Sequence, residues 1–191
     1  MGMDKLRKRA LGLAVAGAIG VGAAAPALAS GDAEERLDAL FAELAEPDRG
    51  DWPRIEAEII RHWSRSGSDA MDLLLRRGNE AMDQEDWIAA VEHLSALVDH
   101  APDFAEGWNA RATAFYMMGE HALALADIEV VLSLNPRHFG ALSGLAVILE
   151  AMGDPYLALG AQRAALALHP HRPEVIRAVE RLERRIGGAD L

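Results

Sequence analysis

One pattern of apolar and small residues occurs three times at equal intervals between positions 71 and 172. In each interval a large apolar residue is followed four positions later by a small one. Three positions after the small residue comes another apolar residue. Spacings of three and four place such residues on one side of an α-helix. We therefore predict an amphipathic helix at the start of each interval. The three sets are Leu74, Gly78 and Ala81; Trp108, Ala112 and Phe115; and Leu142, Ala146 and Leu149.

A second apolar stripe follows after a short turn, starts with alanine and stops close to a proline. Proline lacks an N–H and clashes with the preceding helical turn, so it ends a helix. Helix breakers at equal intervals indicate a repeated architecture rather than a catalytic site. We predict three helical hairpins, in segments 71–104, 105–138 and 139–172. The alanines are Ala90, Ala124 and Ala158, and the prolines are Pro102, Pro136 and Pro170.

This order of residues resembles the tetratricopeptide repeat, in which large, small, aromatic, turn-glycine, alanine and proline positions follow one another over about 34 residues. The middle segment matches the order most fully, through Trp108, Gly119, Ala124 and Pro136. The resemblance implies an all-α solenoid of stacked antiparallel hairpins that binds other proteins. It also leads us to expect that Trp108 is buried between the helices of its hairpin.

The outer segments depart from this pattern at single positions. Glu85 stands where the first segment would have its turn glycine, and polar Gln162 lies on the inner stripe of the third. Arg77 and Arg111 occupy a position at which the family usually has leucine. The resemblance therefore does not define the packing around these side chains.

The segments on either side of the repeats are also amphipathic. Residues 30–70 contain two short apolar faces joined by a turn, and they predict a degenerate hairpin or a cap on the first repeat. Residues 173–191 begin with a proline and carry apolar residues on one face and charges on the other, as a capping helix requires. The apolar positions are Leu37, Leu40, Phe41, Leu44, Ile55, Ile59 and Trp63 in the first segment and Val175, Val179, Leu182 and Ile186 in the second.

Residues 1–29 have the three-part order of a secretory signal peptide. A basic segment precedes an apolar run from Ala10 to Ala25, and the small residues Ala27 and Ala29 flank Leu28. This order predicts export, with cleavage after Ala29. A spanning helix needs about 20 apolar residues, so retention as a membrane anchor is the less favoured alternative. We expect the protein in the periplasm of a Gram-negative bacterium.

Charge and cysteine content narrow the choice of partners. The net charge of the chain is −11, and it becomes −14 without the leader, which carries four basic residues and one acid. A chain of this charge is repelled by nucleic acid and by anionic lipid, so we expect neither as a partner. Because the chain has no cysteine, disulfides and thiolate metal sites are impossible.

The polar residues give little sign of catalysis or cofactor binding. His169 and His171 flank a turn proline, but a structural metal site needs three or four ligands, and we expect a solvated turn there. The chain has no Gly-x-Ser-x-Gly elbow, and its glycine-rich stretch falls in the leader. We therefore predict a protein that is not an enzyme and needs no cofactor, with an unrecognised hydrolase as the least favoured alternative.

The remaining candidate for function is the surface beside the core stripe of each first helix, which in stacked hairpins lines the concave side. Arginine, asparagine and tyrosine side by side suit a peptide backbone or terminus. We predict that a protein segment binds there. The alternatives are an idle solvated face, or a subunit of an envelope assembly that docks through its convex face or ends. The candidate residues, here called the first-helix row, are Arg76, Asn79, Asp83, Asn109, Thr113, Tyr116, Met117, Ser143 and Glu150, with Leu75 and Val147 beside them.

Overall fold

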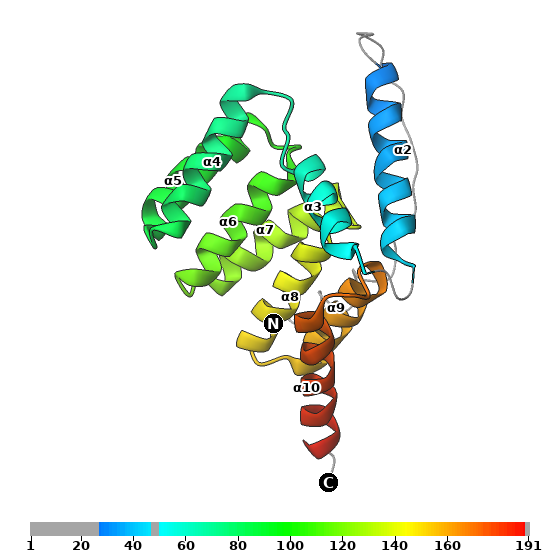
Figure 1. Cartoon of the computed structure of the whole chain (residues 1–191). Helices are drawn as coiled ribbons and strands as arrows, with labels where there is room; N and C mark the ends of the chain where they lie inside the picture. The colour runs from blue at the N-terminus through cyan, green and yellow to red at the C-terminus, as the bar shows by residue number, and fades with distance from the viewer. Residues whose placement is uncertain (1–26, 47–49, 190–191) are drawn as a thin grey trace, which may run out of the picture. The chain divides into compact units, whose positions relative to one another are not determined.

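The computed structural model describes residues 27–46 and 50–189, with side chains between 33 and 188. All regular secondary structure within these ranges is helical (Figure 1). From Glu34 onward the chain forms one compact unit, to which the following description refers. The predicted leader, residues 1–29, lies outside the described residues except for its last three. None of the helices in the described part is both long and apolar enough to cross a bilayer.

The repeats predicted from the sequence are present as three antiparallel helical hairpins. Their second helices begin at the equally spaced residues Trp87, His121 and Pro155, which confirms the predicted all-α architecture of tetratricopeptide type. The hairpins are α4 (Asp69–Asp83) with α5 (Trp87–His100), α6 (Ala105–Met117) with α7 (His121–Leu134), and α8 (Phe139–Ala151) with α9 (Pro155–Leu168). A last helix, α10 (Pro173–Ala189), packs against α9 in the position that a fourth first helix would take.

Small residues allow the two helices of a hairpin to approach closely. Gly78 on α4 is buried against α5, and a Cβ atom added to it would lie 2.5 Å from the Cγ atom of Leu94. Ala112 and Ala146 occupy the equivalent positions and are also buried. Across hairpins, α6 packs against both α4 and α5, and α8 packs against both α6 and α7. The core therefore runs continuously from one hairpin to the next.

Each second helix ends two residues before its proline. The residues between them, Ala101, Asn135 and His169, have φ angles of −135°, −137° and −138°. These values lie in the extended region, which proline imposes on the residue before it. Trp108, which we expected to be fully buried, is half-buried, and its indole Nε1 donates to the carbonyl oxygen of Pro102 at 2.9 Å. Its ring thus joins the start of α6 to the preceding turn.

The arginine at the usual leucine position of the second repeat forms a partly buried ion pair. Arg111 donates from two guanidinium nitrogens to the two carboxylate oxygens of Asp127 on α7, each at 2.8 Å. A third nitrogen donates to the Oγ atom of Ser95 on α5 at 3.3 Å. The hydrogen bond to Asp127 raises the pKa of Arg111 above its ordinary value. One side chain therefore connects three helices. Its two parallel hydrogen bonds to the Asp127 carboxylate fix the orientation of the guanidinium, whereas a leucine at this position would be held by packing alone.

The amino-terminal helices α2 (Ala27–Leu44) and α3 (Trp52–Trp63) pack on the turns that precede α8 and α10. Leu40, Leu44, Ile55 and Ile59 are fully buried there, around the ring of Phe139 at the start of α8. Figure 1 shows α3 lying close to this point. The sequence predicted the apolar faces of both helices but not the surface that they cover.

His169 lies at the centre of this contact, so the prediction that it belongs to a solvated turn is wrong. Its ring is fully buried between those of Trp52 and Phe139, with ring centroids 5.3 Å and 5.1 Å away. Burial, together with the positive charge of Arg172, lowers the pKa of His169 from 6.5 to about 4. The Glu56 carboxylate on α3 lies 3.7 Å from His169 Nε2 and 3.4 Å from Arg172 Nε. Hydrophobic packing places a titratable ring where its charged form is disfavoured.

The turn residue of the first repeat yields a prediction about stability. Glu85 has a φ of 59°, and the equivalent Gly119 and Gly153 have φ of 78° and 86°. A side chain in this left-handed region costs about 1 kcal/mol or more. We expect Glu85→Gly to raise the free energy of unfolding by about 1 kcal/mol in urea titrations, and Gly119→Ala to lower it by a similar amount. Since no atom lies within 4 Å of the added Cβ at Gly119, a loss there reports backbone strain alone. Equal stabilities of the three proteins would contradict this account.

A second prediction concerns acid stability. The pKa of His169 is about 4 in the folded protein and near 6.5 when unfolded, so the unfolded state binds more protons between these values. We expect the free energy of unfolding to fall as the pH drops below 6.5 and this loss to level off below 4, at about 3 kcal/mol in total. His169→Gln should remove this part of the pH dependence. Unfolding measured from pH 7 to pH 4 in both proteins tests it, and parallel curves would refute it.

Candidate partner-binding surface

The first-helix row begins on α4 with three exposed polar residues. Arg76, Asn79 and Asp83 lie on successive turns of α4, and none forms a hydrogen bond or an ion pair among the described residues. Their charges and amide are therefore available to a ligand. Leu75, which we expected beside them, is instead part of the core.

The side chains of the row on α6, unlike those on α4, contact neighbouring residues. Asn109 donates from Nδ2 to the Oε1 atom of Glu106 at 3.2 Å, and Thr113 donates from Oγ1 to the carbonyl oxygen of Asn109 at 3.1 Å. The ring of Tyr116 packs 5.4 Å from that of His121. Met117, at the end of α6, is half-exposed. Asn109 keeps its side-chain carbonyl oxygen and Thr113 keeps its acceptor lone pairs, so both side chains still offer acceptors.

On α8, one polar residue of the row has no hydrogen-bond partner among the described residues and the other forms ion pairs. The Oγ atom of Ser143 is buried and has no hydrogen-bond partner within the described residues. Val147, one turn further on, is exposed. Glu150 is engaged by α10, because Arg181 and Arg185 lie 2.6 Å and 3.2 Å from its two carboxylate oxygens.

The contribution of α10 to this surface was missed by sequence reasoning. Its apolar face indicated a cap, but Arg181 and Arg185 also bring positive charge to the end of the first-helix row. Arg76 provides a cation at the other end. Although the chain as a whole is acidic, basic side chains therefore lie at both ends of the row. The alternation of Arg and Glu along α10 was the signal that pointed to this, but it does not show which helix these arginines face.

A chain of contacts joins the row to the amino-terminal helices. Glu106 accepts from Asn109 on one carboxylate oxygen, and its other oxygen lies 3.0 Å from His138 Nε2. His138 Nδ1 accepts from the backbone N–H of Ala141 at 3.0 Å, so Nε2 is the nitrogen that donates to Glu106. The ring of Trp63 on α3 stacks on His138 with a centroid distance of 4.4 Å. A ring contact and two hydrogen bonds therefore connect α3 with Asn109.

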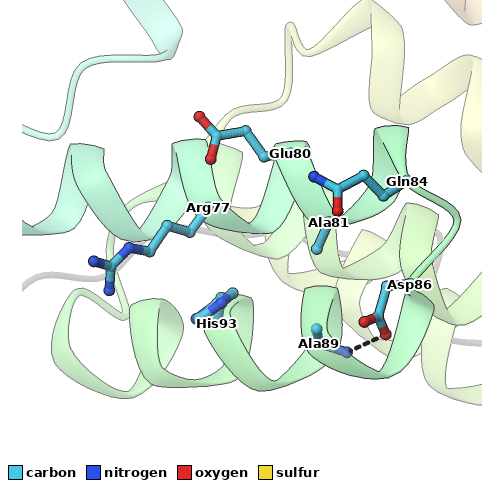
Figure 2. A pocket seen from close by; sticks show the side chains of 7 residues that line it. All are labelled: Arg77, Glu80, Ala81, Gln84, Asp86, Ala89 and His93. Carbon is cyan, nitrogen blue, oxygen red and sulfur yellow. Dashed lines mark hydrogen bonds between the residues drawn. The ribbon is translucent and has the colours of Figure 1, made fainter.

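The arrangement suits non-covalent recognition of a peptide. It combines a guanidinium, two side-chain amides, a hydroxyl and an aromatic ring on adjacent helices, which are groups that bond main-chain carbonyls and carboxylates. No group of three or more His, Asp or Glu side chains that could hold a metal ion is found within the described residues. A cavity of about 320 Å³ lies between α4 and α5 (Figure 2), outside the first-helix row, and sequence reasoning did not predict it.

Comparison with known proteins supports the fold and the family. A TPR repeat-containing protein of Rhizobium etli is 37% identical over 163 residues, which cover 84% of this chain and 79% of that protein. No protein-family model matches the chain. The first TPR domain of Spaghetti (RPAP3), solved with a bound HSP90 peptide, is 20% identical, with a TM-score of 0.61 over 63% of this chain and 95% of that one.

A second solved structure extends the likeness to a bacterial protein. The type III secretion chaperone SycD of Yersinia enterocolitica, solved in complex with a peptide of the translocator YopD, is 16% identical, with a TM-score of 0.58. It covers 62% of this chain and 95% of its own. At these identities the structures establish the fold, and the Rhizobium protein establishes the family. The repeated hairpins and this relative together show that the chain belongs to the tetratricopeptide repeat family.

Proposed function

We propose that the protein is a non-catalytic interaction module of the bacterial periplasm, which holds a segment of a partner protein on its first-helix row. The observation that carries the proposal is a set of polar groups on two adjacent helices, which are unengaged on α4 and locally hydrogen-bonded on α6. Arg76 and Asn79 form no hydrogen bond or ion pair in the described part of the chain, and Asn109 and Thr113 are already oriented by local hydrogen bonds. Pre-oriented groups bind with a smaller loss of conformational entropy.

The bound segment is an extended peptide with a carboxylate. The guanidinium of Arg76 recognises a carboxylate by two parallel hydrogen bonds, and the asparagines satisfy the peptide backbone. Val147 and the half-exposed Met117 add apolar contacts for side chains of the segment. The RPAP3 domain and SycD were both solved with bound peptides, which supports peptide binding by a chain of the same fold.

The periplasmic location rests on the order of the leader residues. Cleavage after Ala29 keeps Leu37, Leu40, Phe41 and Leu44, through which α2 packs on the turn before α8. The contact of α2 and α3 with the turn before α8 is therefore available to the processed protein.

The binding proposal predicts the effect of a double substitution. A photo-crosslinking amino acid at Thr113 identifies the bound segment in envelope extracts, with the same amino acid at exposed Glu129 on α7 as control. Arg76→Ala with Asn109→Ala should then weaken binding of the identified peptide by about 2 kcal/mol, or roughly 30-fold, because it removes the charged donor and one backbone contact. Titration calorimetry measures the change.

Two controls make this experiment decisive. Far-ultraviolet circular dichroism should show unchanged helicity in the double variant, because both residues lie outside the core. Glu129→Ala, which leaves the row intact, should bind as the wild type does. Equal affinities of the double variant and the wild type would refute the proposal.

Export makes a separate prediction about the mature chain. We expect the protein recovered from the periplasmic fraction to begin at Ser30, as intact-mass spectrometry would show. A substitution of Ala29 by a bulky residue should block processing, because the cleavage site requires a small side chain. Recovery of the chain from Met1 in the membrane fraction would show instead that the leader is retained as an anchor.

A further inference from the structure

The first repeat has a face that the later repeats bury. Leu73 on α4 is 39% exposed, whereas Gly107 and Ala141, at the equivalent positions, are buried. Glu80 is exposed as well, and its equivalents Ala114 and Ile148 are buried. The difference arises because α6 and α8 are covered by the second helix of the preceding repeat, while α4 lacks such a cover among the described residues. We call this the end face, made of Leu73, Arg77, Glu80, Ala81, Gln84, Asp86, Ala89 and His93.

The end face contains the cavity of about 320 Å³. Figure 2 shows that Arg77, Glu80 and Gln84 project from α4 and that His93 rises from α5 toward α4. Ala81 and Ala89 form the small-residue floor between the two helices. The hollow thus lies along the line on which a further helix would pack, with the geometry that α5 has against α6.

The second repeat shows which helix would complete this face. There, Arg111 is held by Asp127 of its own hairpin and by Ser95 of the covering helix α5. In the first repeat, Arg77 is the equivalent arginine, but His93 stands in place of the aspartate. Arg77 has no ion pair within the described residues. An incoming helix must therefore supply the carboxylate that the first repeat lacks.

The preceding helix of the same chain does not meet this requirement. In the repeat register, Arg61 of α3 corresponds to Ser95, so stacking α3 on the end face would bring Arg61 next to Arg77. The two like charges would repel each other. The apolar residues of α3, Ile55 and Ile59, are buried elsewhere, against Phe139. Both observations leave the end face open to another molecule.

We propose that the end face binds an amphipathic helix of a partner protein, and that a carboxylate of this helix pairs with Arg77 in the position that Ser95 has opposite Arg111. This helix continues the solenoid as an additional second helix. The site is separate from the first-helix row and does not depend on the function proposed for it. A second copy of the chain is disfavoured as the occupant, because a symmetric contact would bring the acidic Glu80, Asp86 and Glu92 of both copies together.

The α5 sequence itself provides a probe, because α5 covers the equivalent face of α6. The probe is a stapled helical peptide of residues 86–101 that carries Ser95→Glu, and its matched control carries Ser95→Lys. Binding is followed by a fluorophore on Gln84→Cys in the otherwise wild-type protein, which has no other cysteine. We expect the glutamate peptide to bind at least tenfold more tightly than the lysine peptide. This preference opposes the overall negative charge of the protein, so only a local cation can produce it.

Variants of the protein locate the effect. Arg77→Glu should reverse the preference, and Arg177→Glu, at an exposed site on α10, should leave it unchanged. The Arg76→Ala, Asn109→Ala double variant should also keep it, which separates this site from the first-helix row. Equal binding of both peptides, a preference that survives Arg77→Glu, or no binding at about 1 mM peptide would overturn the proposal. A dimer in sedimentation experiments that dissociates with Arg77→Glu would also overturn it, since the occupant would then be a second copy.

Discussion

A hairpin of this protein cannot bury its own first helix completely, and the helix of the preceding hairpin must cover the remainder. This requirement explains why Gly107 and Ala141 are buried while Leu73, at the same position, is exposed. It also determines which polar residues the core accepts. Arg111 is tolerated between three helices because Asp127 and Ser95 satisfy its guanidinium. The same position at the end of the array, Arg77, remains open to solvent.

The amino-terminal helices meet the solenoid through aromatic rings and histidines rather than through repeat stacking. Trp63 on His138 and Trp52 beside His169 place two imidazoles in this contact, which also contains the Glu56 carboxylate and the Arg172 guanidinium. Burial keeps His169 neutral, so this contact weakens in acid. His138 also donates to Glu106, which in turn accepts a hydrogen bond from Asn109, so a chain of contacts connects α3 with a residue of the first-helix row.

Two surfaces of different chemistry follow from this arrangement. The first-helix row presents hydrogen-bonding groups across adjacent helices, which fit an extended peptide. The end face presents a hollow between two helices that holds the acids Glu80 and Asp86 and also Arg77, which has no ion pair among the described residues. The two surfaces belong to different sides of α4.

Repeat periodicity alone predicted the helical hairpins, because the regular spacing of small residues and prolines depends only on local helix geometry and on the chemistry of proline. It also placed Arg76 and Asn79 on the exposed side of α4. Tertiary structure alone decided the rest. The burial of His169 and Leu75 and the pairing of Glu150 with Arg181 and Arg185 depend on residues distant in the chain. A periodic pattern states which side of a helix is apolar, but the neighbour that covers that side, or leaves it open at Arg77, is set by long-range packing.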